Sequence, residues 1–428
     1  MLITDKIEKI NRLVEHIPLP KMIQIEQHFD DQKLVDYKQE LLAELNKEAI
    51  KTTIKPGMRI AITAGSRGIA NMSGILQGIV EFVKSLGGQP FIIPAMGSHG
   101  GATSEGQKAL LAGYGITEEN IKAPIKAIME VQAIGQLDNG LPVYIDKYAS
   151  EADGIIVVNR IKPHTSFRGK YESGLLKMAV IGLGKQKGAE ACHSKGFADM
   201  ANMVERLGSH IILSGRVLFG VAILENAFDE TRELHALLPG EIIDEEPTLL
   251  EKAKSFMPRI LFPACDVLVI DYIGKNFSGP GADPNITGAF ATDYASGGLK
   301  NQSLVVLDLS EESHGNANGI GVADVTTRQL FEKFDMVETY PNALTSTLAA
   351  NAKFPMVMSN HKAAIQAGAK FAMLADPNNL RLIRIRDTLH LKNIWISEAL
   401  LPEVLLNNNI TVCTEASEMI FDEAGNLF

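Results

Sequence analysis

The chain has 428 residues, of which 46% are hydrophobic and 21% are charged. This is ordinary globular composition, and the length is too great for one hydrophobic core, so we expect two domains. The formal net charge is -10, and the lysines and arginines are dispersed among acidic residues. The sequence therefore argues against a nucleic-acid partner.

The sequence shows no targeting or membrane segment. Residues 1–6 lack the apolar run of a signal peptide, and no apolar stretch of about 18 residues follows. The three cysteines, Cys192, Cys265 and Cys413, are odd in number and widely spaced. This usage fits a reducing compartment better than a disulfide framework. We expect a cytoplasmic protein with no membrane partner.

Strand-like and helix-like segments alternate in the first 260 residues. In chain order we expect a strand over 58–64, a helix over 72–86, a strand over 89–96, a helix over 103–113 and a strand over 154–161. The last of these is a continuous β-branched run, which is typical of a strand buried on both faces. The alternation predicts an α/β fold with a mostly parallel sheet.

A second block resumes this alternation. It contains a predicted strand over 266–273, a loop rich in glycine, proline and asparagine over 274–285, a strand over 303–309 and a helix over 322–334. We therefore expect two α/β domains: a larger one over 1–262 that holds the mostly parallel sheet, and a smaller one over 263–428. The last roughly 30 residues are expected to return to the first domain, and the active site is expected in the cleft between the two.

Three short loops follow predicted strands and carry polar side chains. They are 65–68 (GSRG), 97–101 (GSHGG) and 162–164 (KPH). Ligands of open α/β sheets bind at the carboxyl ends of the strands, so these loops lie where chemistry is expected. The first loop matches neither a dinucleotide fingerprint nor a P-loop, and a plain tight turn with an exposed arginine is an equal interpretation. As a ligand site, its Arg67 would clamp a carboxylate.

His99 and His164 stand at two successive strand ends. Imidazole titrates close to neutral pH, so it exchanges protons with little tuning. A lone histidine in a loop is more often a surface or capping residue. Two of them at neighbouring strand ends favour an acid/base pair.

Lys177 and His193 are the next candidates. Lys177 lies in the apolar run 174–182, where a charge is costly unless it is paired or used. It could form an ion pair or a covalent bond through its amine, or its side chain could extend to solvent. The nearby lysines at 170, 185, 187 and 195 are expected to be solvated. His193 could bind a metal, but no zinc motif accompanies it, so further ligands would have to come from a cofactor.

The order and spacing of these segments resemble the lactate racemase family, whose members use a nickel-pincer nucleotide. The resemblance covers the three loops, the run 174–182 and His193, which lies sixteen positions after Lys177. In the second block it extends to the loop 274–285.

The resemblance implies a role for each candidate. Lys177 would attach the cofactor, pyridinium-3-thioamide-5-thiocarboxylic acid mononucleotide, while Ser66 and Gly182 would contact it and His193 would ligate its nickel. His99 and His164 would be the catalytic acid/base pair. Arg67 and Lys275 would bind the substrate.

The implied reaction is inversion at C2 of a 2-hydroxy acid, by reversible hydride transfer to the cofactor. The protein would be a racemase or an epimerase, hence an isomerase, and the enzymes of cofactor synthesis would be its donors. Around Arg67 this chain has 64–65 (AG) and 68–70 (GIA), where family members that act on lactate have an acidic, proline-containing stretch. We therefore expect a 2-hydroxy acid larger than lactate.

Two alternatives stay open. An NAD-dependent 2-hydroxyacid dehydrogenase would explain the histidines and the arginine, although the glycine fingerprint is missing after the first predicted strand. A non-catalytic protein that binds a sugar acid or a nucleotide would use the same scaffold. It would bind ligand tightly without nickel.

Overall fold

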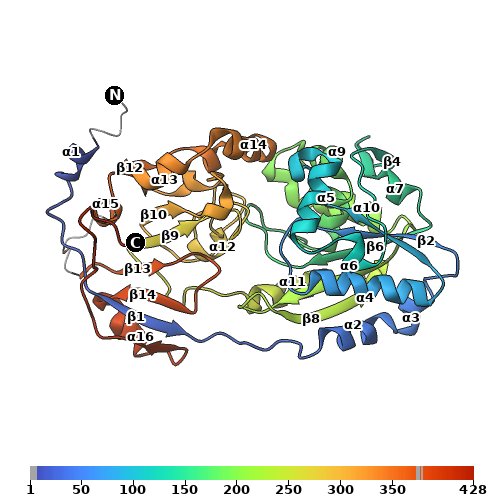
Figure 1. Cartoon of the computed structure of the whole chain (residues 1–428), viewed down its shortest axis with the longest axis horizontal. Helices are drawn as coiled ribbons and strands as arrows, with labels where there is room; N and C mark the ends of the chain where they lie inside the picture. The colour runs from blue at the N-terminus through green and yellow to red at the C-terminus, as the bar shows by residue number, and fades with distance from the viewer. Residues whose placement is uncertain (1–6, 373–375, 377–378) are drawn as a thin grey trace. The chain divides into compact units, whose positions relative to one another are not determined.

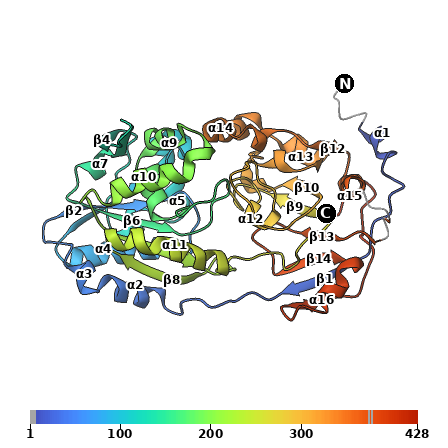
Figure 2. The same cartoon turned by 180° about the vertical axis from the view of Figure 1, so that it is seen from behind.

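The computed structural model describes residues 7–372, 376 and 379–428. These residues form two compact units (Figures 1 and 2). We call residues 30–257 the amino-terminal unit. Residues 258–428, together with the described residues before 30, form the carboxy-terminal unit.

The amino-terminal unit is built on a five-stranded sheet in the order β3-β2-β6-β7-β8. Its strands are β2 (Arg59–Ala64), β3 (Gln89–Pro94), β6 (Gly154–Arg160), β7 (Val217–Glu225) and β8 (Thr231–Leu237). The first four strands run parallel, and only β8 is antiparallel to its neighbour. The α/β class and the mostly parallel sheet expected from the sequence are confirmed.

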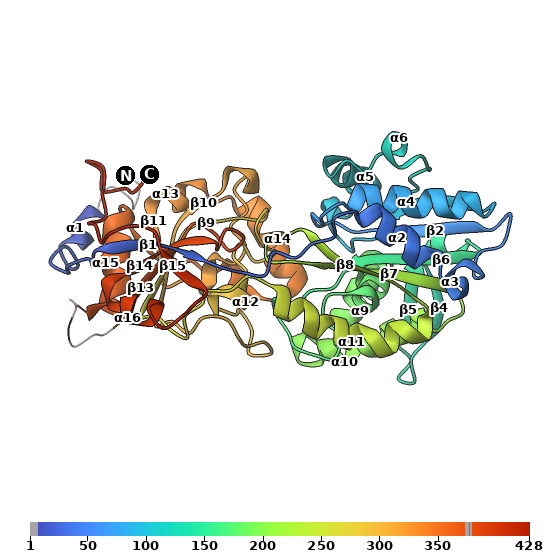
Figure 3. The same cartoon turned by 90° about the horizontal axis from the view of Figure 1, so that it is seen from below.

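Helices cover both faces of this sheet (Figure 3). On one face lie α2 (Tyr37–Leu45) and α4 (Met72–Ser85), and on the other lie α10 (Met200–Ile212) and α11 (Pro239–Phe256). The apolar residues of α4 recur every three or four positions, and Ile75, Leu76 and Ile79 are fully buried against the sheet. The side chains of α4 therefore form much of the core of this unit.

Shorter elements complete the amino-terminal unit. They are α3 (Glu48–Lys51), a 3₁₀ turn (Gly100–Ala102), α5 (Ser104–Gly113), α6 (Glu118–Ile121), β4 (Val131–Gln136), β5 (Pro142–Asp146), α7 (Lys147–Ser150), α8 (Leu175–Lys177), a π-helical turn (Met178–Gly182), α9 (Lys185–His193) and a 3₁₀ turn (Phe197–Asp199). The strands β4 and β5 pair only with each other.

The carboxy-terminal unit holds an eight-stranded sheet in the order β12-β11-β10-β9-β13-β14-β1-β15. Its strands are β1 (Met22–Gln27), β9 (Val267–Ile273), β10 (Ser303–Leu309), β11 (Val325–Thr327), β12 (Met356–Met358), β13 (Leu382–Ile385), β14 (Asn393–Ser397) and β15 (Ile410–Val412). The five strands from β12 to β13 are parallel, and the other three are antiparallel to their neighbours.

The helices of this unit are mostly short. They are α1 (Glu8–Asn11), α12 (Pro284–Thr287), α13 (Arg328–Lys333), α14 (Met336–Ser346), α15 (His361–Phe371) and α16 (Leu401–Val404), with 3₁₀ turns at Glu311–Ser313, Ile320–Val322, Ala349–Ala352 and Glu398–Leu400. The apolar face of α15 packs on β9, β10 and β11. In the described part of the chain, no helix has the length and apolar character to cross a membrane.

One predicted helix is wrong in its first half. The segment 322–334 was expected to be helical throughout, but residues 325–327 form β11, and α13 begins only at Arg328. The β-branched residues of β11 pair in parallel with β10 on one side and with β12 on the other. Thr327 then caps the helix, because its hydroxyl accepts a hydrogen bond from the N–H of Leu330 at 3.2 Å.

The described residues before 30 group with the carboxy-terminal unit, which differs from the expected first domain of 1–262. The reason is β1, which lies between β14 and β15 and pairs antiparallel with both. The residues after 398 also stay in this unit, because β15 closes its sheet edge. Such pairing across more than 350 positions leaves no local sequence pattern.

Adjacent leucines on α2 provide a test of this packing. Leu41 is 2% exposed and lies against α4 at Gly78, whereas Leu42 is 54% exposed. We expect Leu41→Ala to lower the free energy of unfolding by about 2 to 5 kcal/mol, and Leu42→Ala to change it by less than about 0.5 kcal/mol. Urea unfolding of both variants measures the difference. Equal losses would contradict the packing of α2 on α4.

Candidate active site

Three loops meet at the carboxyl edge of the amino-terminal sheet. The strands β3, β2 and β6 are parallel neighbours, so the loops that follow Pro94, Ala64 and Arg160 leave the sheet on the same side. These loops carry His99, the pair Ser66 and Arg67, and His164, respectively. Sheet order thus brings together side chains that lie nearly 100 residues apart in the sequence.

The loop after β2 is fixed at both ends. The Oγ of Ser66 lies 2.5 Å from Nδ1 of His99, so the first two loops contact each other directly. At the other end of the loop, the N–H of Ala70 donates to Glu225 at 2.7 Å, and Glu225 also pairs with Arg160. The loop that holds the exposed Arg67 is therefore supported by β6 and β7.

The loop after β3 requires glycine. Gly100 has a φ of 66°, and a Cβ there would lie 2.6 Å from the backbone N of Gln107. The side chain of Gln107 donates to the carbonyl oxygens of Gly97 and His99, at 3.0 and 3.3 Å. This places His99 half-buried above the start of α5.

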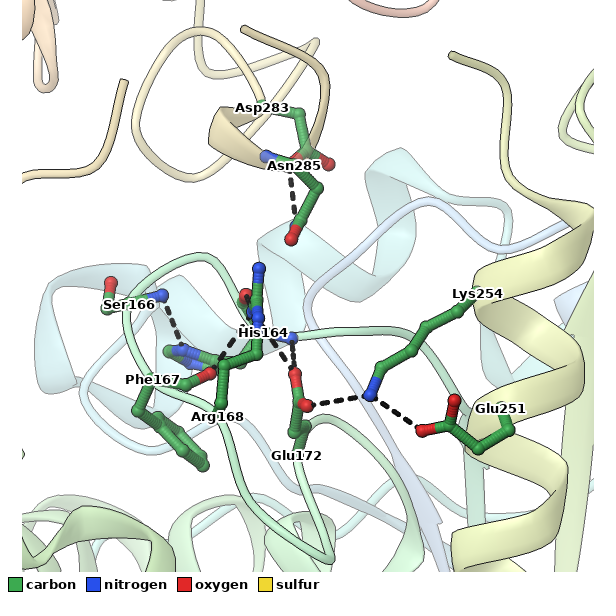
Figure 4. Close-up of polar contacts among 9 residues, drawn as sticks. All are labelled: His164, Ser166, Phe167, Arg168, Glu172, Glu251, Lys254, Asp283 and Asn285. Atoms are coloured by element: carbon green, nitrogen blue, oxygen red, sulfur yellow. Dashed lines mark hydrogen bonds and ion pairs between the residues drawn. The ribbon is translucent and has the colours of Figure 1, made fainter. Parts of the chain in front are cut away.

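His164 lies in a loop that leaves β6 and closes on itself. Lys162 and Ser173 form an isolated bridge at its base. The N–H of His164 donates to Oε2 of Glu172 at 2.7 Å, and Arg168 donates to the carbonyl of His164 at 2.6 Å (Figure 4). The carboxylate of Glu172 is fully buried and also meets Lys254 at 3.1 Å. Both main-chain polar groups of His164 are thus held inside its own loop.

The chain next forms α8, which carries Lys177. The carboxylate of Glu246, on α11, accepts the N–H groups of Leu175 and Leu176 at 3.0 and 3.1 Å. A Cβ on Gly174 would lie 2.0 Å from this carboxylate, so only glycine fits there. A buried glutamate therefore caps the helix whose last residue is Lys177.

A π-helical turn follows Lys177 directly. Such turns are rare and are frequently found at functional sites. At its end, a Cβ on Gly182 would lie 2.5 Å from Sδ of Met178 and 2.7 Å from the carbonyl of Ala95. Gly182 therefore allows the turn to pack against the loop that leads to His99.

The basic groups of this region influence one another. Burial, and then the charge of Arg67, lower the pKa of Lys177 to about 8. Burial, and then Lys177, lower the pKa of His193 to about 4. Burial and the charges of four neighbours, with Lys177 the strongest, place the pKa of His164 well below its ordinary value. At neutral pH both histidines are uncharged.

His193 ends α9 and stands edge-on to the ring of Phe197, with the ring centres 5.4 Å apart. Its Nδ1 is buried and has no hydrogen-bond partner among the described residues. Across the described ranges, no three His, Cys, Asp or Glu side chains come together as a metal site. His193 therefore offers one free nitrogen to a metal whose other ligands come from elsewhere.

Lys185 was expected to be solvated, and the structure shows that this is wrong. Its side chain is fully buried, and its ammonium group donates to the carbonyl of Pro94 and to Oε1 of Gln107 at 3.2 Å, and forms an ion pair with Oδ2 of Asp146 at 3.2 Å. The polar run 185–187 gives no sign of this burial. The only sequence signal is Gly184 and Gly188, where a Cβ would meet the carbonyl of Val180 at 2.1 and 2.6 Å.

Lys275 belongs to the carboxy-terminal unit, after β9. Its N–H donates to Oγ of Ser313 at 2.9 Å and its Nζ donates to the carbonyl of Gly279 at 2.7 Å. These contacts shape the loop 274–285 itself. The expected contact of Lys275 with substrate stays a prediction.

The buried ion pair yields a stability prediction. Lys185→Met would leave the carboxylate of Asp146 buried without its partner, so we expect a loss of about 3 to 5 kcal/mol in the free energy of unfolding. Lys187→Met, two positions along and exposed, should change it by less than about 0.5 kcal/mol. Asn at position 146 keeps the acceptor that caps α7 but lacks the charge. Adding Asp146→Asn to Lys185→Met should therefore restore part of the stability that Lys185→Met loses. Urea unfolding measures all three, and equal effects of the two lysine variants would refute the pair.

The lowered pKa of Lys177 yields a reactivity prediction. At pH 8 roughly half of the Lys177 amines are neutral, against under about 1% for an exposed lysine with a pKa of about 10.4. Trace acetylation followed by peptide mapping should show Lys177 reacting half-maximally near pH 8, and the lysine of an added reference peptide only near its ordinary pKa of about 10.4. Identical pH profiles would contradict this environment.

The lowered pKa of Lys177 also makes the stability of the protein depend on pH. Between pH 8 and about 10.4 the unfolded chain binds the Lys177 proton and the folded chain does not, so this group makes the protein more stable as pH rises through that window. Lys177→Met should flatten the rise.

Part of this chain is similar to known proteins. Residues 15–204 match the family model described as the lactate racemase N-terminal domain, a segment that contains all the candidates from Ser66 to His193. Among solved structures, the chain is similar to the lactate racemase apoprotein from Thermoanaerobacterium thermosaccharolyticum, with 13% identity, a TM-score of 0.49, and coverage of 90% of this chain and 96% of that chain. The search of curated proteins gave no match. Residues 15–204 are thus a domain of the lactate racemase N-terminal type, as the motifs in this segment predicted.

Proposed function

We propose that this protein is a racemase or epimerase that inverts C2 of a 2-hydroxy acid with a nickel-pincer nucleotide as its cofactor. One observation carries the proposal. His99, His164, Lys177 and His193 lie on loops and helices at one edge of the amino-terminal sheet. All four fall within the segment that matches the lactate racemase N-terminal domain.

The residues present fit the cofactor. The amine of Lys177, with its lowered pKa, is suited to a covalent attachment. The unpartnered Nδ1 of His193 is suited to nickel that a cofactor brings with its other ligands. Ser66 and Gly182 would contact the cofactor from the two neighbouring segments. When bound, the cofactor supplies the acceptor and donor for the C2 hydride.

Arg67 is suited to the substrate carboxylate. It is exposed at the strand-end loop, and its planar guanidinium can donate two parallel hydrogen bonds to one carboxylate. Its charge also holds Lys177 toward the neutral form. Arg67 would therefore orient the acid and keep the attachment amine nucleophilic.

The two histidines would handle the hydroxyl proton. One imidazole takes that proton as the substrate becomes a planar 2-keto acid, and the other, once it is itself protonated to the imidazolium, gives a proton to the oxygen when hydride returns to the opposite face. Inversion needs a proton partner on each face, which a dehydrogenase does not. The second histidine is thus the feature that favours an isomerase.

Cofactor loading provides the first test. Protein co-expressed with the enzymes of pincer-cofactor synthesis should gain a covalent mass and bound nickel. Lys177→Ala should lose the mass gain and His193→Ala should lose nickel, whereas Lys187→Ala should keep both. Intact-mass spectrometry and metal analysis read the result. No adduct and no nickel would reject the cofactor and leave the binding-protein interpretation.

Activity provides the second test. On loaded protein, chiral analysis of a panel of 2-hydroxy acids larger than lactate should show inversion, with kcat lowered about 100-fold or more by His99→Ala and by His164→Ala. The exposed His28→Ala serves as control and should match the wild type. Oxidation that depends on added NAD, without inversion, would support the dehydrogenase instead.

A further inference from the structure

The two proposed acid/base histidines differ in the partner that holds Nδ1. In His99, Nδ1 faces the hydroxyl of Ser66 at 2.5 Å. In His164, Nδ1 faces the backbone N–H of Ser166 at 3.0 Å. A hydroxyl donates or accepts, whereas an amide N–H only donates. This difference restricts one histidine and not the other.

The restriction fixes where the ring proton of His164 lies. A neutral imidazole has one N–H and one bare nitrogen. Because the N–H of Ser166 can only donate, Nδ1 of His164 must be the bare nitrogen, and the proton is on Nε2. If Nδ1 were protonated, its N–H and the N–H of Ser166 would point at each other and repel. His99 has no such conflict, since Oγ of Ser66 can accept from Nδ1–H in both the neutral and the protonated ring, and can donate to a bare Nδ1.

Other contacts hold the His164 ring in this orientation. Phe167, which is 1% exposed, lies with its ring centre 4.3 Å from that of His164. The main-chain N–H and carbonyl of His164 are bound by Glu172 and Arg168 (Figure 4). A ring flip or a shift of Ser166 would disturb several of these contacts at once. The arrangement of the loop therefore favours a single tautomer.

We propose that the backbone N–H of Ser166 fixes neutral His164 as the Nε2–H tautomer, so that His164 meets the substrate oxygen as a hydrogen-bond donor. Ser166 is thus a positioning residue that acts through its main chain. In the resting site the hydroxyl proton then moves to Nε2 of His99, while Nε2–H of His164 donates to the oxygen on which charge changes. A proton transfer at His164 requires the bond from Ser166 to open first. The substrate part of this inference rests on the proposed function, and the tautomer does not.

Solid-state ¹⁵N NMR of protein labelled only at histidine tests the tautomer. The spectrum of the cofactor-free wild type minus that of His164→Asn isolates the two ring nitrogens of His164 among the 10 histidines. At pH 7.5 we expect a bare Nδ1 and a protonated Nε2. A protonated Nδ1, in either the neutral or the doubly protonated ring, would overturn the proposal.

Two variants of one residue test the cause. Ser166→Pro removes the N–H, whereas Ser166→Ala keeps it. We expect the bare Nδ1 signal of His164 to be lost or reduced in Ser166→Pro and unchanged in Ser166→Ala. Unchanged spectra in both would show that Ser166 does not set the tautomer. If Ser166→Pro does not fold, the wild-type spectrum alone still decides the tautomer. These spectra need no turnover, so a protein that fails to racemise 2-hydroxy acids would reject the function and leave the tautomer result standing.

Discussion

The buried ammonium group of Lys185 is the interaction on which the geometry of the candidate site depends. It binds the carbonyl of Pro94 at the end of β3, the side chain of Gln107 on α5, and Asp146 at the start of α7. Gln107 in turn holds two carbonyls of the loop that carries His99. Lys185 is also the first residue of α9, whose last residue is the proposed nickel ligand. One cation therefore links the loop that carries a proposed proton partner to the helix that carries a proposed metal ligand.

The backbone conformation and the burial of Lys185 both cost free energy. Its φ is 55°, in the left-handed region that residues other than glycine rarely adopt, which costs on the order of 1 kcal/mol or more. Burial lowers the pKa of Lys185 and raises that of Asp146, and the facing charge of each opposes the shift. The two buried charges face each other as an ion pair, and the ammonium group also donates to the carbonyl of Pro94 and to the side chain of Gln107, which offsets part of the cost of burial.

A second constraint is electrostatic. Lys177, His164 and His193 are all basic groups, and burial lowers the pKa of each. The charge of Lys177 lowers the pKa of both histidines further. The result is a region in which His164 and His193 are neutral near physiological pH, and in which a larger share of the Lys177 amine is neutral than in an exposed lysine. The buried carboxylates nearby, Glu172 and Glu246, bind backbone N–H groups and position these side chains. In this region the two glutamates hold the backbone, and Lys177, His164 and His193 are left to carry the proposed chemistry.

The sequence was sufficient to predict the elements whose character is local. The strands β2, β3, β6, β9 and β10 and the helices α4 and α5 begin and end within two residues of the predicted bounds, because β-branched runs and amphipathic periods record burial directly. Strand order could then be argued to bring the three loops to one edge. The pairing of β1 with β14, the strand hidden inside 322–334, and the burial of Lys185 and Glu246 could not be predicted, because each depends on partners far away in the chain.

The proposed function requires that C2 inverts through hydride transfer, with histidines that handle only the oxygen proton. The most direct test uses one enantiomer of a 2-hydroxy acid that carries deuterium at C2, incubated with loaded protein in ordinary water. With hydride transfer, the inverted product keeps deuterium at C2, because the nucleus that leaves is the one that returns. Inverted product with hydrogen at C2 would show proton abstraction from carbon and would contradict the account.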